Sequence, residues 1–219
     1  MQRVVEPEIL DELPEDDPAA LHNRRDLTIL NRLMGNYRWF ARAIADFELI
    51  SKADELLEFG AGQGELGLHL KRKFSGRRLP PYTALDFCSP PTGWPSSWRW
   101  IQQDLLEYPN TPKPLGVMGN LILHQFSDQA LATLGKRLDE DAQWLLFCEP
   151  ARRKMHLHQL RLGAVLNFGE VTWHDAPVSI RAGFINFELP KLLQLDSSRW
   201  EWRCSTTFLG AYRMIAWRK

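Results

Sequence analysis

The chain has 219 residues, a length that corresponds to one large domain or two very small ones. Its 27 basic and 27 acidic residues give a formal net charge of zero, which argues against a protein that works mainly by gripping nucleic-acid phosphates. Charged residues at 25% and apolar residues at 44% argue against global disorder. No run approaches 18 uninterrupted apolar residues, so no membrane span is expected.

The N-terminus does not read as a signal peptide, and the cysteines are sparse. Residues 1–20 hold seven acids, three prolines and only Arg3 as a base, so we expect an acidic, partly ordered lead-in. The odd number and wide spacing of Cys88, Cys148 and Cys204 argue against a disulfide framework or a structural zinc site, and no metal is predicted. This cysteine usage is typical of the reducing cytoplasm, the expected location.

From residue 21 onward the chain predicts one α/β domain. Residues 21–50 show helical periodicity and are expected to form a helical lid, with Gly35 as a break between two helices. Strands and helices then alternate, which predicts a mostly parallel sheet with helices on both faces. The expected strands are residues 55–59, 82–86, 98–102, 115–123 and 144–149, and the expected helices between them are residues 65–74 and 128–138.

The last third of the chain changes character. A basic helix is expected from about Arg152, at the start of a substrate-side region that extends over residues 151–198. Residues 199–219 contain two adjacent strand-like runs with a short break, which predict an antiparallel pair that closes the sheet. No linker divides residues 21–219, so we expect a single domain in which residues 55–150 form the ligand-binding core.

The most informative segment runs from Leu56 to Gly67 and reads LLEFGAGQGELG: a strand, a glycine turn and a helix. Glycine is needed where the backbone takes a positive φ or approaches a ligand without a Cβ in the way. In an open α/β sheet the ligand lies outside the carboxyl ends of the strands, so this turn is expected to be a ligand floor. Residues 62–67 also match the dinucleotide pattern GxGxxG, with Asp86 as the acid at the end of the next strand.

The nicotinamide pattern, however, should begin directly after the strand, where the first glycine is Gly60. Read from there, the segment is ExGxGxG, which resembles motif I of the class I S-adenosylmethionine-dependent methyltransferases. The resemblance implies a Rossmann-like sheet of seven strands and S-adenosyl-L-methionine as the cofactor. It also implies that the turn contacts the cofactor through Glu58, Gly60, Ala61, Gly62 and Gly64.

Two further segments resemble the family on the adenosine side of the cofactor. Asp86 and Phe87, at the end of the second strand, resemble the residues that hold the ribose hydroxyls. Gln103, Asp104 and Leu105, after the third strand, resemble the segment that flanks adenine.

The end of the fourth strand resembles motif IV, which lies beside the reacting methyl group, and there the resemblance places Asn120 and Leu121 at the cofactor. One departure is residues 88–95, where prolines prevent the helix that the family usually has. We therefore expect the adenine side of the pocket to be built differently.

Segments outside the cofactor half resemble a subfamily of small bacterial methyltransferases (UbiE-like), some of which are encoded beside polyketide-type genes. These segments are residues 25–32, 147–153 and 171–184. The resemblance brings no defined methyl acceptor.

Methyl transfer is an in-line displacement in which the enzyme aligns donor and acceptor and, where necessary, removes a proton. The candidate catalytic residues are His124, just past the fourth strand, the pair His174 and Asp175, expected beside a turn, and Arg181. Each has a structural alternative. His124 could be a packing residue, His174 could anchor a loop, and Arg181 could form a salt bridge to Asp175 or Glu149 instead of binding a substrate anion or carbonyl.

Exclusion of water favours this reaction, so a lid is expected. Residues 24–40 are the natural lid, and from there Asn31 and Tyr37 could reach the methionine end of the cofactor or merely pack between helices. Residues 167–184 are expected to form another wall of the acceptor site.

The predicted function is thus an S-adenosylmethionine-dependent methyltransferase for a small, apolar or aromatic acceptor, and no oligomeric state is predicted. The alternatives are an RNA or protein methyltransferase, an inactive cofactor-binding partner protein, and a nicotinamide oxidoreductase. The zero net charge, and the lack of an Asn-Pro-Pro-Tyr-like motif after the fourth strand, make nucleic acid a poor candidate. Residues 1–20 carry a charge of −6 and residues 152–219 a charge of +6, so we expect the two parts to contact each other when the lid closes.

Overall fold

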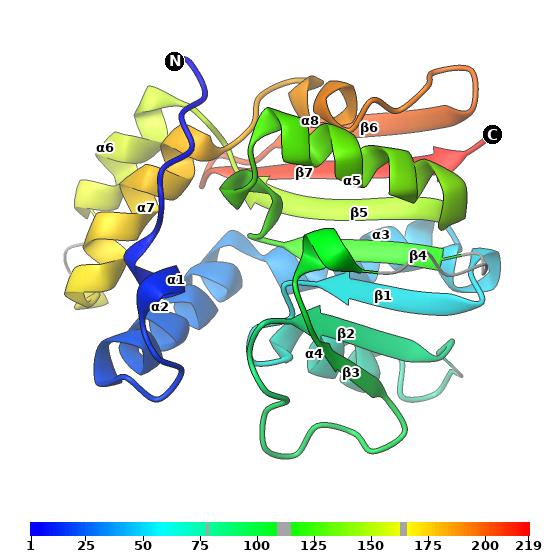
Figure 1. Ribbon diagram of the computed structural model, residues 1–219, viewed down its shortest axis with the longest axis horizontal. Helices are drawn as coiled ribbons and strands as arrows, with labels where there is room; N and C mark the ends of the chain where they lie inside the picture. The colour runs from blue at the N-terminus through cyan, green and yellow to red at the C-terminus, as the bar shows by residue number, and fades with distance from the viewer. Residues whose placement is uncertain (78, 109–114, 163–165) are drawn as a thin grey trace.

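A computed structural model describes residues 1–77, 79–108, 115–162 and 166–219. Within these residues, seven strands form one sheet in the order β3-β2-β1-β4-β5-β7-β6 (Figure 1). They are β1 (Glu55–Phe59), β2 (Tyr82–Asp86), β3 (Arg99–Gln102), β4 (Leu115–Asn120), β5 (Ala142–Pro150), β6 (Trp200–Thr206) and β7 (Ala211–Arg218). Strands β1 to β5 pair in parallel, and β7 lies antiparallel between β5 and β6. The predicted Rossmann-like, mostly parallel sheet and its antiparallel C-terminal pair are confirmed.

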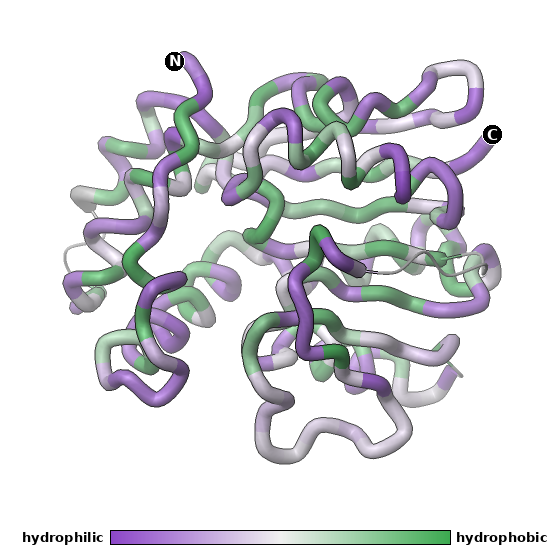
Figure 2. The backbone as a smooth tube through the Cα atoms, in the orientation of Figure 1, coloured by the Kyte–Doolittle hydropathy of each residue, from purple (hydrophilic) through white to green (hydrophobic). Residues whose placement is uncertain are grey.

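Helices cover both faces of the sheet and give each face its own core. The helices that cover the sheet are α3 (Asn36–Asp46) and α4 (Glu65–Lys73) on one face, and α5 (Asp128–Asp141) and α8 (Glu188–Leu192) on the other. Along β5, Leu146 packs with α3 and α4, whereas Phe147 packs with α5 and α8. Because β5 is buried on both faces, it is hydrophobic along most of its length (Figure 2).

The remaining helices gather beyond the carboxyl ends of β1, β4 and β5 (Figure 1). They are α1 (Ile9–Glu12), α2 (Pro18–Met34), α6 (Lys154–Leu162) and α7 (Glu170–Ala182). The N-cap of helix α2 is Asp17, whose carboxylate accepts a hydrogen bond from the amide of Ala19. Its C-cap is Gly35, which has a φ of +67° and is the predicted break before α3. No helix among the described residues is long and apolar enough to cross a membrane.

Two sequence expectations are wrong in detail. The fourth strand does not continue to residue 123: it ends at Asn120 because Leu121 turns the chain with a φ of +59°. His174 does not lie beside a turn, because residues 170–182 form a continuous helix in spite of Pro177. Helix α7 is held against α2 by the buried carboxylate of Asp26. This carboxylate accepts hydrogen bonds from the amide of Gly169 at 2.9 Å and from the hydroxyl of Thr172 at 2.7 Å.

Candidate active site

The glycine turn after β1 adopts the backbone conformation that only glycine takes without strain. Gly60, Gly62 and Gly64 have φ values of +60°, +57° and +70°. A Cβ on Gly60 would lie 2.7 Å from Ile122, and one on Gly64 would lie 2.5 Å from the ring of Trp94. A Cβ on Gly62 would meet no atom within 4 Å. Of these three glycines, Gly62 is therefore the one that exposes its backbone to open space.

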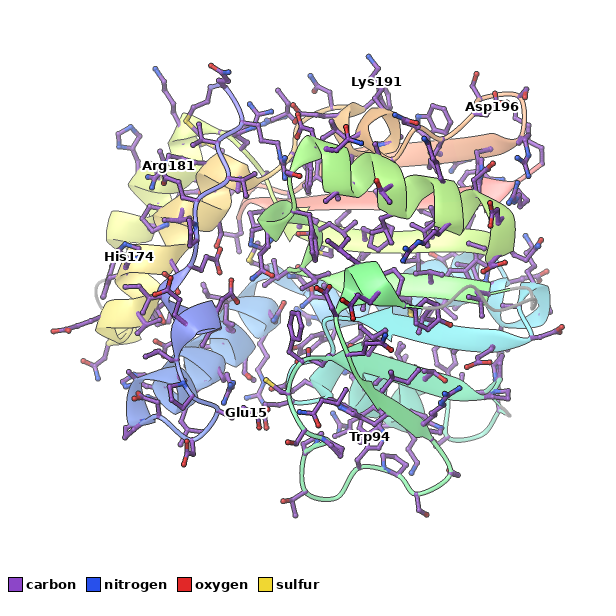
Figure 3. All side chains as sticks on the ribbon, in the orientation of Figure 1. Glu15, Trp94, His174, Arg181, Lys191 and Asp196 are labelled. Carbon is purple, nitrogen blue, oxygen red and sulfur yellow. The ribbon has the colours of Figure 1, made fainter. Side chains whose placement is uncertain are left out.

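Gly64 and Gly67 are explained by packing. Both lie under Trp94, and a Cβ on Gly67 would lie 3.0 Å from the hydroxyl of Tyr82. Trp94, labelled in Figure 3, belongs to the proline-rich segment of residues 88–95 between β2 and β3. This loop supplies an aromatic cover for the turn, and packing under Trp94 accounts for Gly64 and Gly67.

Asp86 closes the turn from the end of β2. Its Oδ2 accepts a 2.7 Å hydrogen bond from the amide of Gly62, and its Oδ1 accepts a 2.8 Å bond from the amide of Cys88. The next side chain, Phe87, is 67% exposed, whereas Ala61, inside the turn, is buried. The carboxylate of Asp86, which can accept hydrogen bonds from hydroxyl groups, thus lies next to the exposed aromatic ring of Phe87.

The residues predicted to lie beside adenine have local structural partners. The amide of Gln103 donates to the carbonyl of Asp86 at 3.0 Å, which ties this segment to the end of β2. The carboxylate of Asp104 caps η2 (Leu105–Glu107), and Leu105 is buried in the core. The side-chain amide of Gln103 donates to the carbonyl of Glu107 at 3.2 Å. The backbone of this segment therefore lies near Asp86, while both polar side chains are engaged in the turn.

Glu58 lies inside the sheet. Its carboxyl group is fully buried and accepts a 2.5 Å hydrogen bond from the hydroxyl of Tyr82. Burial, together with the charges of Glu65 and Asp86, raises the pKa of Glu58 to about 8, although the bond from Tyr82 opposes this. At pH 7 the group is mostly protonated and neutral, which suits a buried position.

A buried amide cluster connects the N-terminal helices to the end of β4. The Oδ1 atom of Asn31 accepts hydrogen bonds from the side-chain amides of Asn36 and Asn120, at 2.8 Å and 3.0 Å. The Oδ1 atoms of Asn36 and Asn120 are buried and have no partner among the described residues. Because a buried acceptor without a donor is costly, these oxygens suit the donor groups of a ligand. The amide of Leu121 bonds back to the carbonyl of Cys148 at 2.8 Å and holds the end of β4 in place.

A cavity of about 530 Å³ adjoins this cluster, between α2, α3 and α4. Burial, followed by the charges of Glu65 and Glu58, raises the pKa of Tyr37, so its phenol stays neutral. Thr28 donates to the carboxylate of Glu65 across the cavity at 3.0 Å. The cavity is lined by Thr28, Asn31, Arg32, Gly35, Tyr37, Arg38, Glu65, Leu68, His69 and Arg72. Asn31 and Tyr37 therefore face a polar space beside the first turn of α4.

His124 belongs to the short helix η3 (Leu123–Gln125), and its imidazole ring lies between two carboxylates. Its Nδ1 is 2.8 Å from Oε2 of Glu149, and its Nε2 is 3.2 Å from Oε1 of Glu8. Burial lowers the pKa of the imidazole, but the hydrogen bonds to Glu149 and Glu8 outweigh it and raise the pKa to about 10. At neutral pH His124 is a cation whose two N–H groups are both engaged. In this arrangement His124 is not suited to take a proton from an acceptor, because neither ring nitrogen has a free lone pair; a catalytic role for it stays a prediction.

Sequence reasoning missed the role of Glu149, which was considered only as a partner for Arg181. This carboxylate at the end of β5 is fully buried. Besides the ring of His124, it accepts hydrogen bonds from the amides of Ile122, Leu123 and His124 at 3.2, 2.9 and 3.3 Å. An acid in an otherwise apolar strand was the available signal, and its function here is to fix the loop after β4.

The other candidate catalytic side chains lie on α7 with structural partners. The ring of His174 is 52% exposed, and its Nδ1 is 2.8 Å from Oδ1 of Asp175. Asp175 is buried and accepts hydrogen bonds from the first two amides of α1, at 2.9 Å and 3.0 Å. Arg181 pairs with Glu6 at 3.2 Å, so the predicted alternative of a salt bridge is right in kind but not in partner. Figure 3 shows His174 and Arg181 in the helical layer away from the sheet.

Comparison with known proteins places this architecture in a class of folds. No protein-family model matches the chain, and no curated protein matches its sequence. Many solved structures match its fold, and the neighbours described below include S-adenosylmethionine-dependent methyltransferases. The chain therefore has the Rossmann-like methyltransferase fold.

Three solved structures illustrate the likeness. The plantazolicin methyltransferase BpumL, in complex with a pentazolic desmethylPZN analog and SAH, matches with a TM-score of 0.72 at 10% identity, over 96% of this chain and 93% of that one. Human N-acetylserotonin methyltransferase in complex with SAM matches with a TM-score of 0.54 at 13% identity, over 95% of this chain and 61% of that one. A cyclopropane-fatty-acyl-phospholipid synthase-like protein from Lactobacillus casei ATCC 334 matches with a TM-score of 0.55 at 14% identity, over 87% of this chain and 92% of that one. At these identities the likeness establishes the fold, and the UbiE-like subfamily stays a prediction.

Proposed function

We propose that this protein is an S-adenosylmethionine-dependent methyltransferase that acts on a small, apolar or aromatic acceptor. The observation that carries the proposal is the open space over Gly62, in a turn that Asp86 closes from the next strand. The neighbours BpumL and N-acetylserotonin methyltransferase, which share the fold, were solved with SAH and SAM respectively. Turn geometry, strand order and fold likeness therefore support the same ligand.

The residues around the turn fit the chemistry of S-adenosylmethionine. The missing Cβ of Gly62 lets the backbone approach the ligand. The carboxylate of Asp86 would accept from the ribose hydroxyls, and the exposed ring of Phe87 offers a surface for adenine. The unpartnered oxygens of Asn36 and Asn120 would accept from the ammonium group of the methionine part.

When bound, the cofactor supplies an activated methyl group on a sulfonium. The contribution of the chain is to align donor and acceptor and to exclude water. The loop that carries His124 is rigid, because Glu149 binds three of its amides. At neutral pH His124 carries a proton and a positive charge, so the role of His124 is to orient or bind an acceptor rather than to deprotonate it.

Calorimetric titration with SAH and with NADH tests the proposal. We expect saturable SAH binding with one site per chain and no binding of NADH. Binding of NADH without SAH would replace the proposal with a nicotinamide enzyme, and binding of neither would reject the turn as a nucleotide site.

A further inference from the structure

The N-terminal residues 1–17, here called the strap, run along α7 and then form α1 (Figure 1). Glu8 is the buried residue of the strap, and α1 buries none. The acidic loop between α1 and α2 is hydrophilic in Figure 2. The strap thus contributes no fully buried apolar side chain, and polar contacts hold it.

These polar contacts attach the strap along its whole length. Near its start, the guanidinium of Arg3 donates to the carbonyls of residues 124, 126 and 182. At its end, Oε1 of Glu15 accepts a 2.9 Å bond from the amide of Ser89, so the strap reaches the loop after β2. The contact of Glu15 is exposed, and exposed polar contacts exchange with water more readily than a packed core does, so this end of the strap is suited to open.

Glu8, in the middle of the strap, is bound as a carboxylate ligand would be. It accepts from the Nε2–H of His124, at 3.2 Å, and from the hydroxyl of Ser179. An imidazolium and a hydroxyl are donors that recognise carboxylates through charge-assisted hydrogen bonds. On the far side of the ring, Glu149 fixes the orientation of His124 whether or not Glu8 is present.

The strap closes against a concentration of negative charge. The carboxylates near His124 come from three elements: Glu8 and Asp11 from the strap, Glu149 from β5 and Asp175 from α7. Burial and the charges of Glu8 and Asp175 raise the pKa of Asp11 to about 6, although His124 opposes this. Near neutral pH, repulsion at Asp11 therefore works against the closed strap, whereas at Glu8 burial is outweighed by the pairing with His124, which lowers the pKa of Glu8 and holds the strap closed.

We propose that His124 and Ser179 form a subsite for a carboxylate group of the acceptor, and that Glu8 fills this subsite while the strap is closed. This rests on the proposed methyltransferase function, because His124 follows β4 shortly after Asn120, on the side of the sheet assigned to the cofactor. The acceptor class is then an apolar or aromatic carboxylic acid, which displaces Glu8 when it binds.

Calorimetry with benzoate as the probe tests this subsite, and its neutral analogue benzamide serves as a control ligand. We expect Glu8→Ala to bind benzoate about tenfold or more tightly than the wild-type chain, since the competing carboxylate is gone. Glu6→Ala is the matched control, because Glu6 is an exposed strap residue paired only across the surface with Arg181. It should bind benzoate as the wild type does, and benzamide should gain nothing in either variant.

A second substitution locates the binding groups. Adding Ser179→Ala to Glu8→Ala should reverse most of the gain, and it avoids His124→Gln, which would leave Glu149 buried without its cation. Equal benzoate affinity in Glu8→Ala and wild type, both folded by circular dichroism, would overturn the subsite, as would an equal gain for benzamide. SAH titration of the same samples separates the two proposals. SAH binding without the benzoate gain rejects the subsite alone, and the gain without SAH binding supports a carboxylate site but rejects the methyltransferase.

Discussion

At the scale of single residues, the imidazole of His124 joins carboxylates from two distant parts of the chain, Glu8 in the N-terminal strap and Glu149 at the end of β5. A histidine after the fourth strand invites the role of a base, yet, against the effect of burial, two acidic neighbours raise its pKa to about 10 and keep it a cation at neutral pH. Its partners lie 116 and 25 positions away in sequence, so no local pattern could predict them. Burial favours the neutral form of both His124 and Glu58, and at Glu58 it prevails, because the charges of Glu65 and Asp86 add to it; the group is mostly neutral.

These shifts predict how stability depends on pH. The folded pKa of His124, about 10, exceeds the ordinary value of 6.5, so its contribution is complete below pH 6.5 and is lost as pH rises to 10. The folded pKa of Glu58, about 8, exceeds 4.5, so the unfolded chain loses this proton first and stability falls as pH rises from 4.5 to 8. The free energy of unfolding of the wild type should therefore fall from pH 6.5 to pH 10.

Denaturant titrations across this range, on wild type and Glu58→Gln, check the assignment. The substitution should make the fall shallower below pH 8, where Glu58 and His124 both contribute, and leave unchanged the part between pH 8 and 10, which belongs to His124. Each proton that the folded state keeps and the unfolded state has lost lowers the free energy of unfolding by about 1.4 kcal/mol per pH unit. An identical pH profile for both proteins would contradict the buried, protonated state of Glu58.

At the scale of elements, the turn from β1 to α4 uses its glycines for two purposes. Gly62 leaves room for a ligand, whereas Gly64 makes room for Trp94 from the loop after β2. The sequence pattern finds both glycines but cannot separate these purposes, because the ring that covers Gly64 comes from a proline-rich loop without regular periodicity. Likewise, Pro177 argues against a helix locally, and the contacts of α7 with α6, and with α1 and α2, which are distant in sequence, support the helix there.

The two purposes predict unequal costs of adding one methyl group. Gly62→Ala should cost about 1 kcal/mol of stability, since only the positive φ is strained. Gly64→Ala should cost roughly 2–4 kcal/mol, because the same strain is joined by a clash with Trp94. Thermal or denaturant unfolding of both variants measures the difference, and equal costs would show that Trp94 does not pack on the turn as described.

At the scale of the whole molecule, the alternation of strands and helices was enough to predict the sheet, and the closing pair of strands followed from two adjacent strand-like runs. The position of β7 between β5 and β6 could not be read from the sequence, since pairing order depends on which edge the last strands reach. The sequence predicted the attachment of the strap only through charge, because residues 1–20 carry −6 and residues 152–219 carry +6. Which acids meet which partners, such as Glu6 with Arg181, depends on how the chain folds back.

The central claim is that the open backbone at Gly62 is the floor of the cofactor site, and SAH affinity of two arginine variants tests it most directly. Gly76, in the turn after α4, also has open space around it and is exposed, so Gly76→Arg controls for the addition of an arginine side chain. We predict that Gly62→Arg abolishes SAH binding, while Gly76→Arg retains affinity within about threefold of wild type. SAH binding by folded Gly62→Arg with wild-type affinity would contradict the claim.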